Sequence, residues 1–181
     1  MAHPSQLPVG VEIRPLVLHG DERGSFLEIF RDEWDTAVQP VQWNVVRSEP
    51  GTLRGVHVHV VHDDYFVVVS GEAAVGLRDL RPGSATEGLG TLVELSADEP
   101  AVLVIPSGVA HGFYFRERSV HVYGVTHYWD EADELSCHWS DPGLAIPWPE
   151  QPVLLSQRDA EAPSLASMRA ALVSAFEVAS A

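Results

Sequence analysis

The 181-residue sequence contains no lysine, and all eleven of its basic residues are arginines. This absence excludes chemistry that depends on a lysine side chain, such as Schiff-base formation or phosphate binding by a P-loop. The formal net charge of −15 disfavours nucleic acids and anionic membranes as partners, because both require a cationic surface. An anionic ligand must therefore be held by a few local arginines, against the field of the whole molecule.

Cysteine is almost absent as well, since Cys137 is the single one in the chain. An internal disulfide is therefore excluded, and we expect a buried, inert thiol. The sequence has no run of 18 apolar residues, and its N-terminus lacks a basic segment followed by an apolar one. These absences predict a soluble, non-secreted, cytoplasmic protein.

Short strand patterns follow one another from residue 10 to about residue 128, at a spacing of roughly ten residues. Because no helical pattern separates them, they indicate an all-β antiparallel sandwich or barrel. Residues 138–152 are rich in proline and tryptophan and should form an extended segment on the body. Apolar residues at near-helical spacing predict a C-terminal helix over about 163–179. No linker interrupts the chain, so we expect one domain, 1–181, with its core at about 10–165.

The stretch TLRGVHVHVVHDDYFVVVSGEA, residues 52–73, brings three histidines and two aspartates close together. Alternate residues of a strand share a face, so His57 and His59 project together and the intervening valines project the other way. A histidine pair at this spacing suits a first-row metal, and Asp64 with the later His111 could complete the site. This order resembles the two motifs of the cupin superfamily, with aspartate where glutamate is usual. His62 lies in the predicted turn VVHDD, where we expect it to be solvated.

A larger set of segments carries a more specific resemblance: HGDERGSFLEIFR, VQWNVVRSEPGTLRGVH, SGEAAVGLRDLRPGSATEG, VLVIPSGVAHGF, VYGVTHYW, SDPGLAIPWP and LLSQRDAEAPSL. In order and spacing they resemble the dTDP-4-dehydrorhamnose 3,5-epimerase family, a metal-independent branch of the cupins. The resemblance implies a single cupin-type antiparallel jelly-roll barrel that needs no cofactor. It also implies a homodimer whose N-terminal segments contribute to the partner's sheet.

The activity that the resemblance implies is epimerisation of a nucleotide-linked 4-keto-6-deoxysugar, with dTDP as the carrier, at C3, C5 or both. A C–H bond beside a ketone is only weakly acidic, so a positioned base must remove the proton while the enolate is stabilised. An acid on the opposite face then returns a proton. The resemblance assigns the base to His57 in RGVH, its orienting carboxylate to Asp159 in LLSQRDA, and the acid to Tyr123 in VYGVT.

Six further residues fall on substrate-contacting positions of the family: Arg23, Glu28, Gln42, Asn44, Arg54 and His111. Among these, Arg23 and Arg54 would bind the diphosphate through paired N–H donors. Their alternative role is structural, as partners of Asp21 or Glu22 in ion pairs at the end of the barrel.

Two positions depart from the family. His59 stands where a neutral residue is general, and Asp64 stands where the family has a lysine close to the keto oxygen. An ionised carboxylate beside a forming enolate would destabilise it by roughly a few kcal/mol. Asp64 therefore points away, or His59 or His111 supplies the missing donor, or the chemistry differs from that of the family.

These departures leave two alternatives to the metal-free epimerase. One is a metal-dependent cupin enzyme with a divalent metal held by His57, His59, Asp64 and His111. The other is an epimerase-like scaffold repurposed for acid–base chemistry on another biosynthetic intermediate. The first alternative conflicts with the role of His57 as a base, because an imidazole lone pair that binds a metal cannot also accept a proton.

Overall fold

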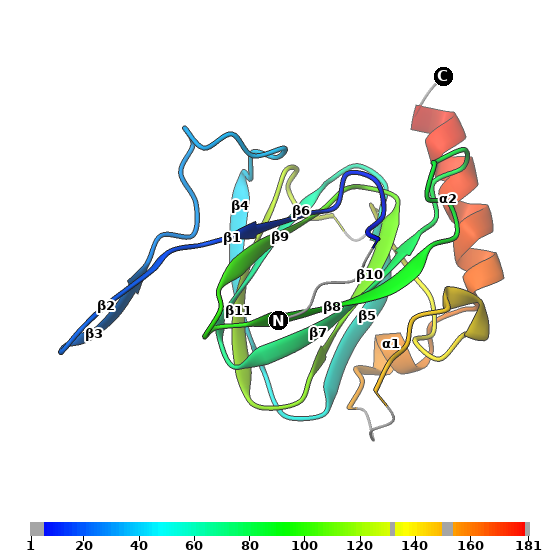
Figure 1. Ribbon diagram of the computed structural model, residues 1–181. Helices are drawn as coiled ribbons and strands as arrows, with labels where there is room; N and C mark the ends of the chain where they lie inside the picture. Colours follow the sequence, from blue (N-terminus) through cyan, green and yellow to red (C-terminus); the bar gives the residue numbers. More distant parts are fainter. Residues whose placement is uncertain (1–5, 131–132, 150–153, 180–181) are drawn as a thin grey trace.

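The computed structural model describes residues 6–130, 133–149 and 154–179. Two five-stranded antiparallel sheets pack face to face as a jelly roll (Figure 1). The first sheet has the order β1 (Glu12–Pro15), β9 (Ala101–Ile105), β6 (Asp64–Ser70), β11 (Ser119–Val125) and β4 (Gln42–Ser48). The second has the order β12 (Glu134–Ser136), β5 (Thr52–His59), β10 (Val109–Phe115), β7 (Glu72–Asp79) and β8 (Gly90–Ser96).

A separate hairpin, β2 (Leu18–Asp21) with β3 (Gly24–Leu27), projects away from the two sheets (Figure 1). We call residues 16–28 the arm. The strand β3 ends at Leu27, before the chain turns back to β4.

The two faces of β5 lie against different parts of the molecule. Val56 and Val58 are fully buried in an outer cluster, where they pack beneath the C-terminal helix α2 (Leu165–Ala179) with Met168 and Leu172. His57 and His59 point the other way, into the space between the sheets. The predicted alternation of this strand is therefore confirmed, and the valines bury apolar area that fixes β5 under α2.

The remaining elements lie between β11 and α2. They are β12, a 3-10 helix (Pro142–Leu144) and the one-turn helix α1 (Gln157–Ala160). The sequence did not predict β12 or α1, yet both contribute side chains to the site described below. Within the part of the chain that the structure describes, no helix has the length and apolarity that a membrane span requires. The cytoplasmic location and the single domain stay predictions.

Candidate active site

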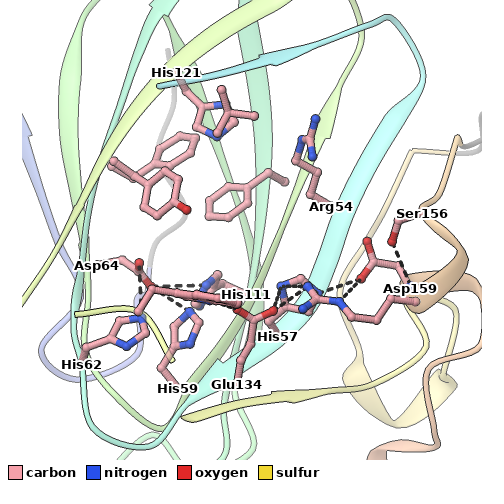
Figure 2. A pocket seen from close by; sticks show the side chains of 16 residues that line it. Arg54, His57, His59, His62, Asp64, His111, His121, Glu134, Ser156 and Asp159 are labelled. Carbon is pink, nitrogen blue, oxygen red and sulfur yellow. Dashed lines mark hydrogen bonds and ion pairs between the residues drawn. The ribbon is translucent and has the colours of Figure 1, made fainter. Parts of the chain in front are cut away.

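A cavity of about 480 Å³ opens between the two sheets. Side chains of β4, β6 and β11 form one wall, and side chains of β5, β10 and β12 form the other, with α1 at the rim (Figure 2). Of the residues singled out in the sequence, this cavity brings together His57, Asp159, Tyr123, Arg54 and His111, and also His59 and Asp64.

The imidazole of His57 bonds to Asp159: its Nε2 lies 2.7 Å from Asp159 Oδ1. Asp159 reaches this position because Ser156 caps α1, with its Oγ accepting a hydrogen bond from the Asp159 amide at 3.1 Å. Burial alone would raise the pKa of the Asp159 carboxyl, but its hydrogen bonds from His57 and Ser156 outweigh burial and hold that pKa below its usual range. The carboxylate therefore stays ionised and can orient the ring.

Gly55 allows β5 to place His57 next to α1. Its φ of +116° favours glycine, and a Cβ at this position would lie 2.8 Å from the Cα of Gly112 and from the carbonyl oxygen of His111. A side chain here would push β5 away from β10, and the Gly55 amide would lose its approach to Asp159 Oδ2 at 3.5 Å.

Two charged residues that the sequence did not predict surround the same ring. Glu134 of β12 places Oε1 3.3 Å from His57 Nδ1, and Arg158 of α1 places Nη2 2.9 Å from His57 Nε2 while it pairs with Glu134. Burial tends to raise the pKa of Glu134, but His57, a hydrogen bond from the indole of Trp129, and Arg158 together lower it. Arg158 directly precedes Asp159 and so had a weak sequence signal, whereas Glu134 stood in an acidic run with none.

Tyr123 lies on β11, in the sheet opposite to that of His57. Burial, followed by the carboxyls of Asp64 and Glu134, raises the pKa of its phenol, although Arg54 acts in the opposite direction. Tyr123 therefore keeps its proton near neutral pH and can act as a donor.

The floor of the cavity holds His59, His62, Asp64 and His111 (Figure 2). The prediction that His62 is solvated is wrong, because its side chain is 1% exposed and its Nδ1 lies 2.7 Å from Asp133 Oδ2. Asp64 lines the cavity rather than pointing away, and burial raises its pKa well above the usual range. Burial lowers the pKa of His59 well below its usual range and that of His111 to about 4. Low dielectric thus favours the neutral forms of His59, Asp64 and His111.

The predicted substrate-contacting residues divide into three groups. Arg54 lines the cavity, with Nε bonded to Ser48 Oγ at 3.0 Å and Nη2 bonded to the Arg47 carbonyl at 3.1 Å. Gln42 and Asn44 lie on β4 outside the cavity lining, joined by a 3.1 Å bond between Gln42 Nε2 and Asn44 Oδ1.

The third group lies on or beside the arm, away from the cavity of its own chain. Arg23 forms an exposed ion pair with Asp21, and Glu28 pairs with Arg31. The structural alternative considered for Arg23, a pair with Asp21, is therefore what this single chain shows. The cavity of one chain is built without Arg23 or Glu28.

A family model described as dTDP-4-dehydrorhamnose 3,5-epimerase matches residues 6–167. The chain belongs to this family. A dTDP-4-dehydrorhamnose 3,5-epimerase from Shigella flexneri is 34% identical over 164 residues, which cover 86% of this chain and 90% of the relative.

Two solved structures show the same fold. An epimerase from Legionella pneumophila in complex with dTDP-4-keto-L-rhamnose has a TM-score of 0.82 at 36% identity, covering 90% of this chain and 91% of that one. A 3'-monoepimerase from Streptomyces bikiniensis in complex with dTDP-quinovose has a TM-score of 0.84 at 30% identity, covering 98% and 96%. The expected cupin-type fold and the isomerase class of this family member are confirmed. Epimerases of the family act without a cofactor.

Proposed function

We propose that this family member inverts a carbon beside the keto group of a dTDP-linked 4-keto-6-deoxysugar, at C3, C5 or both. His57 removes the proton and Tyr123 returns one. The observation that carries the proposal is their placement on the two facing sheets that enclose one cavity. Inversion requires removal from one face of a planar enolate and return to the other, and this arrangement provides a group on each side.

The contacts of His57 support its role as the base. With Nε2–H donating to Asp159, the lone pair resides on Nδ1, so Asp159 fixes the tautomer and stabilises the imidazolium that forms on proton transfer. Arg54, also in the cavity, is the arginine available to bind the diphosphate in this lysine-free chain. Among the charged residues of the cavity, Arg54 and Arg158 are the two arginines, and Arg158 is engaged with Glu134.

We further propose a homodimer in which the arm of one protomer reaches the partner. The arm exposes Val17 (67%) and Phe26 (61%), β4, an edge strand of its sheet, exposes Val45 (62%), and the residue before β4 exposes Val41 (54%). An edge strand also offers unpaired backbone N–H and C=O groups to another chain. Contact with another chain would bury these exposed apolar side chains. In such a dimer, Arg23 would contribute to the cavity of the partner. This accounts for the position of Arg23 away from the cavity of its own chain.

The reaction itself provides the test. Purified protein incubated with dTDP-4-keto-6-deoxyglucose in D2O should incorporate deuterium at each carbon that it inverts, followed by NMR. His57→Ala should lower the rate of exchange by roughly 10²–10⁴-fold, because the base is lost. His127→Ala, which removes an exposed histidine outside the cavity, is the matched control and should exchange at the rate of the unmodified protein.

Absence of deuterium at both C3 and C5 in the unmodified protein would contradict the proposal. If the protein also fails to bind the dTDP sugar in calorimetry, the repurposed scaffold becomes the better reading. The carbon that carries deuterium, read from the same spectra, decides whether one centre or two are inverted.

A further inference from the structure

Three side chains on the cavity floor form a compact set of potential metal ligands: His59, His62 and Asp64. One donor atom from each lies within 4.8 Å of the others. They are 7%, 1% and 5% exposed, respectively. Within the described residues, His59 Nδ1, His62 Nε2 and Asp64 Oδ2 are buried and have no hydrogen-bond partner. His59 turns its other nitrogen, Nε2, toward Asp64. Unsatisfied polar atoms such as His62 Nε2 and Asp64 Oδ2 in one buried cluster are costly unless something binds between them.

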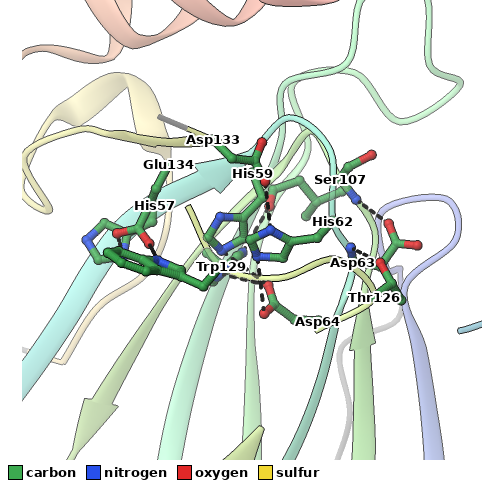
Figure 3. Close-up of polar contacts among 12 residues, drawn as sticks. His57, His59, His62, Asp63, Asp64, Ser107, Thr126, Trp129, Asp133 and Glu134 are labelled. Carbon is green, nitrogen blue, oxygen red and sulfur yellow. Dashed lines mark hydrogen bonds and ion pairs between the residues drawn. The ribbon is translucent and has the colours of Figure 1, made fainter. Parts of the chain in front are cut away.

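The outer contacts of the histidines direct their free nitrogens inward. His62 Nδ1 lies 2.7 Å from Asp133 Oδ2, so this nitrogen carries the proton and Nε2 carries a lone pair. Asp133 is itself held in place, because its Oδ1 accepts the amides of Val60 and Val61, each at 2.8 Å (Figure 3).

His111 follows the same pattern. Its Nδ1 lies 3.1 Å from the Val109 carbonyl oxygen, which can only accept, so the neutral ring presents the Nε2 lone pair to Asp64. A histidine whose outer N–H is bonded to a carboxylate or a carbonyl is the arrangement that orients metal-ligating histidines.

The distances from Asp64 to His59 and to His111 match a coordination shell, and His62 lies slightly farther away. Donor atoms at the corners of a tetrahedron with bonds of 2.0–2.1 Å lie roughly 3.3–3.4 Å apart. Asp64 Oδ2 lies 3.4 Å from His59 Nε2 and 3.3 Å from His111 Nε2, and Asp64 Oδ1 lies 4.0 Å from His62 Nε2 (Figure 2).

We propose that His59, His62 and Asp64, with His111 as a fourth donor, bind a first-row divalent metal such as Zn²⁺. Imidazole and carboxylate donors suit this class of ion. The set differs from the one that the sequence suggested, because His57 is engaged with Asp159 and Glu134, and His62 takes its place. The base and the metal thus use different histidines, and the conflict at His57 disappears.

The metal site goes beyond the proposed function, since proton transfer by His57 and Tyr123 requires no metal. A dication bound to one carboxylate and neutral imidazoles leaves net positive charge on the cavity floor. It would therefore remove the unfavourable effect of an ionised Asp64 beside an enolate.

Titration of the metal-stripped full chain with Zn²⁺ in calorimetry tests the site. We expect one Zn²⁺ per chain, and at least about 100-fold weaker binding in Asp64→Ala and His59→Ala, each of which removes a ligand. His127→Ala is the matched control, since it removes an exposed histidine outside the cavity, and it should change the affinity by less than about threefold.

A substitution of a residue that is not itself a ligand provides a second test. Asp133→Asn should weaken Zn²⁺ binding about 10–100-fold, because it alters the bond that orients His62 without removing a ligand. Zinc-edge X-ray absorption of the loaded unmodified protein should show imidazole nitrogens at 2.0–2.1 Å. Circular dichroism and thermal denaturation establish that each variant is folded.

Failure of the unmodified protein to bind Zn²⁺ would overturn the metal site, as would binding that Asp64→Ala leaves unchanged. Either result leaves the proposed epimerase intact, because deuterium exchange is measured separately on metal-stripped protein. Conversely, stoichiometric Zn²⁺ binding without deuterium exchange would support the site and contradict the proposed function.

Discussion

At the scale of single residues, the proton that Tyr123 donates can be separated from the proton that His57 removes. Tyr123→Phe removes only the hydroxyl, and its ring remains among the partly buried residues beside the main core. We expect formation of the inverted product to fall roughly 10²–10⁴-fold, while deuterium exchange at the substrate carbon persists. Exchange persists because His57 can still remove the proton and return deuterium to the same face.

NMR of the substrate and product carbons measures both rates in one sample. Tyr128→Phe, which alters an exposed tyrosine outside the cavity lining, is the control and should leave both rates unchanged. A parallel loss of exchange and inversion in Tyr123→Phe would contradict the assignment of Tyr123 as the acid.

Single residues also show where sequence reasoning succeeds. The resemblance to the family paired His57 with Asp159 from motifs about a hundred residues apart, and the structure places the two side chains 2.7 Å from each other. His62 was misjudged, because a turn in the sequence carries no sign of the residue that will cover it. Here Asp133 follows more than 70 residues later and covers His62. Glu134 was missed for the same reason, since β12 has only three residues.

At the scale of elements, the loop between β7 and β8 depends on the buried carboxylate of Asp79. Its oxygens accept hydrogen bonds from Arg81 Nε at 2.9 Å, Ser84 Oγ at 2.7 Å and Thr86 Oγ1 at 2.6 Å. Burial opposes ionisation, but these bonds prevail and the pKa of Asp79 lies below its usual range. A lowered pKa stabilises the fold above the unfolded-state value of about 4, and this stability is lost as the pH falls through the folded-state value.

Asp79→Asn should therefore lower the free energy of unfolding by about 2–4 kcal/mol at pH 7. The deficit should shrink as the pH falls below about 4, because the unfolded chain then binds a proton that the folded carboxylate excludes. Urea denaturation at several pH values measures both effects. Glu94→Gln is the control, because its pair with Arg116 is partly exposed and should contribute under about 1 kcal/mol. A deficit independent of pH would contradict the role of the charge.

The docking of α2 gives a second prediction at this scale. Leu172 is fully buried against β5, whereas its neighbour Val173 is 39% exposed. Leu172→Ala should lower the free energy of unfolding by about 2–4 kcal/mol, because it leaves a cavity in the outer cluster. Val173→Ala, on the same turn of the helix, should change it by less than about 0.5 kcal/mol. Equal effects in urea denaturation would mean that α2 does not stabilise the barrel through this face.

Elements with a strong periodic pattern were predictable from the sequence, and short ones were not. The strands from β4 to β11 and the helix α2 carry enough alternating or helical positions to be recognised. The four residues of α1 and the three of β12 carry no period at all, and their positions depend on contacts with β5. The site depends on these two elements, so its full outline required the structure.

At the scale of the whole molecule, the exposed arm bears on whether each cavity contains residues of one chain or of two. If Arg23 of one protomer serves the cavity of its partner, a chain with His57→Ala and a chain with Arg23→Ala are complementary. Each homodimer would be impaired, but a mixed dimer would contain one cavity with an intact base and an intact arm. Co-expression with two different affinity tags allows the mixed dimer to be purified.

We expect the purified mixed dimer to recover roughly half of the unmodified activity, because one of its two cavities is complete. A chain that carries both substitutions, paired with an unmodified chain, is the matched control. In that dimer, the unmodified chain has the base but receives the substituted arm, and the other cavity lacks the base. Its activity should therefore stay near that of Arg23→Ala or below. Greater recovery in the control dimer would show that Arg23 acts within its own chain, and equal recovery would show that Arg23 has no role in the cavity; either result would contradict the shared-cavity dimer.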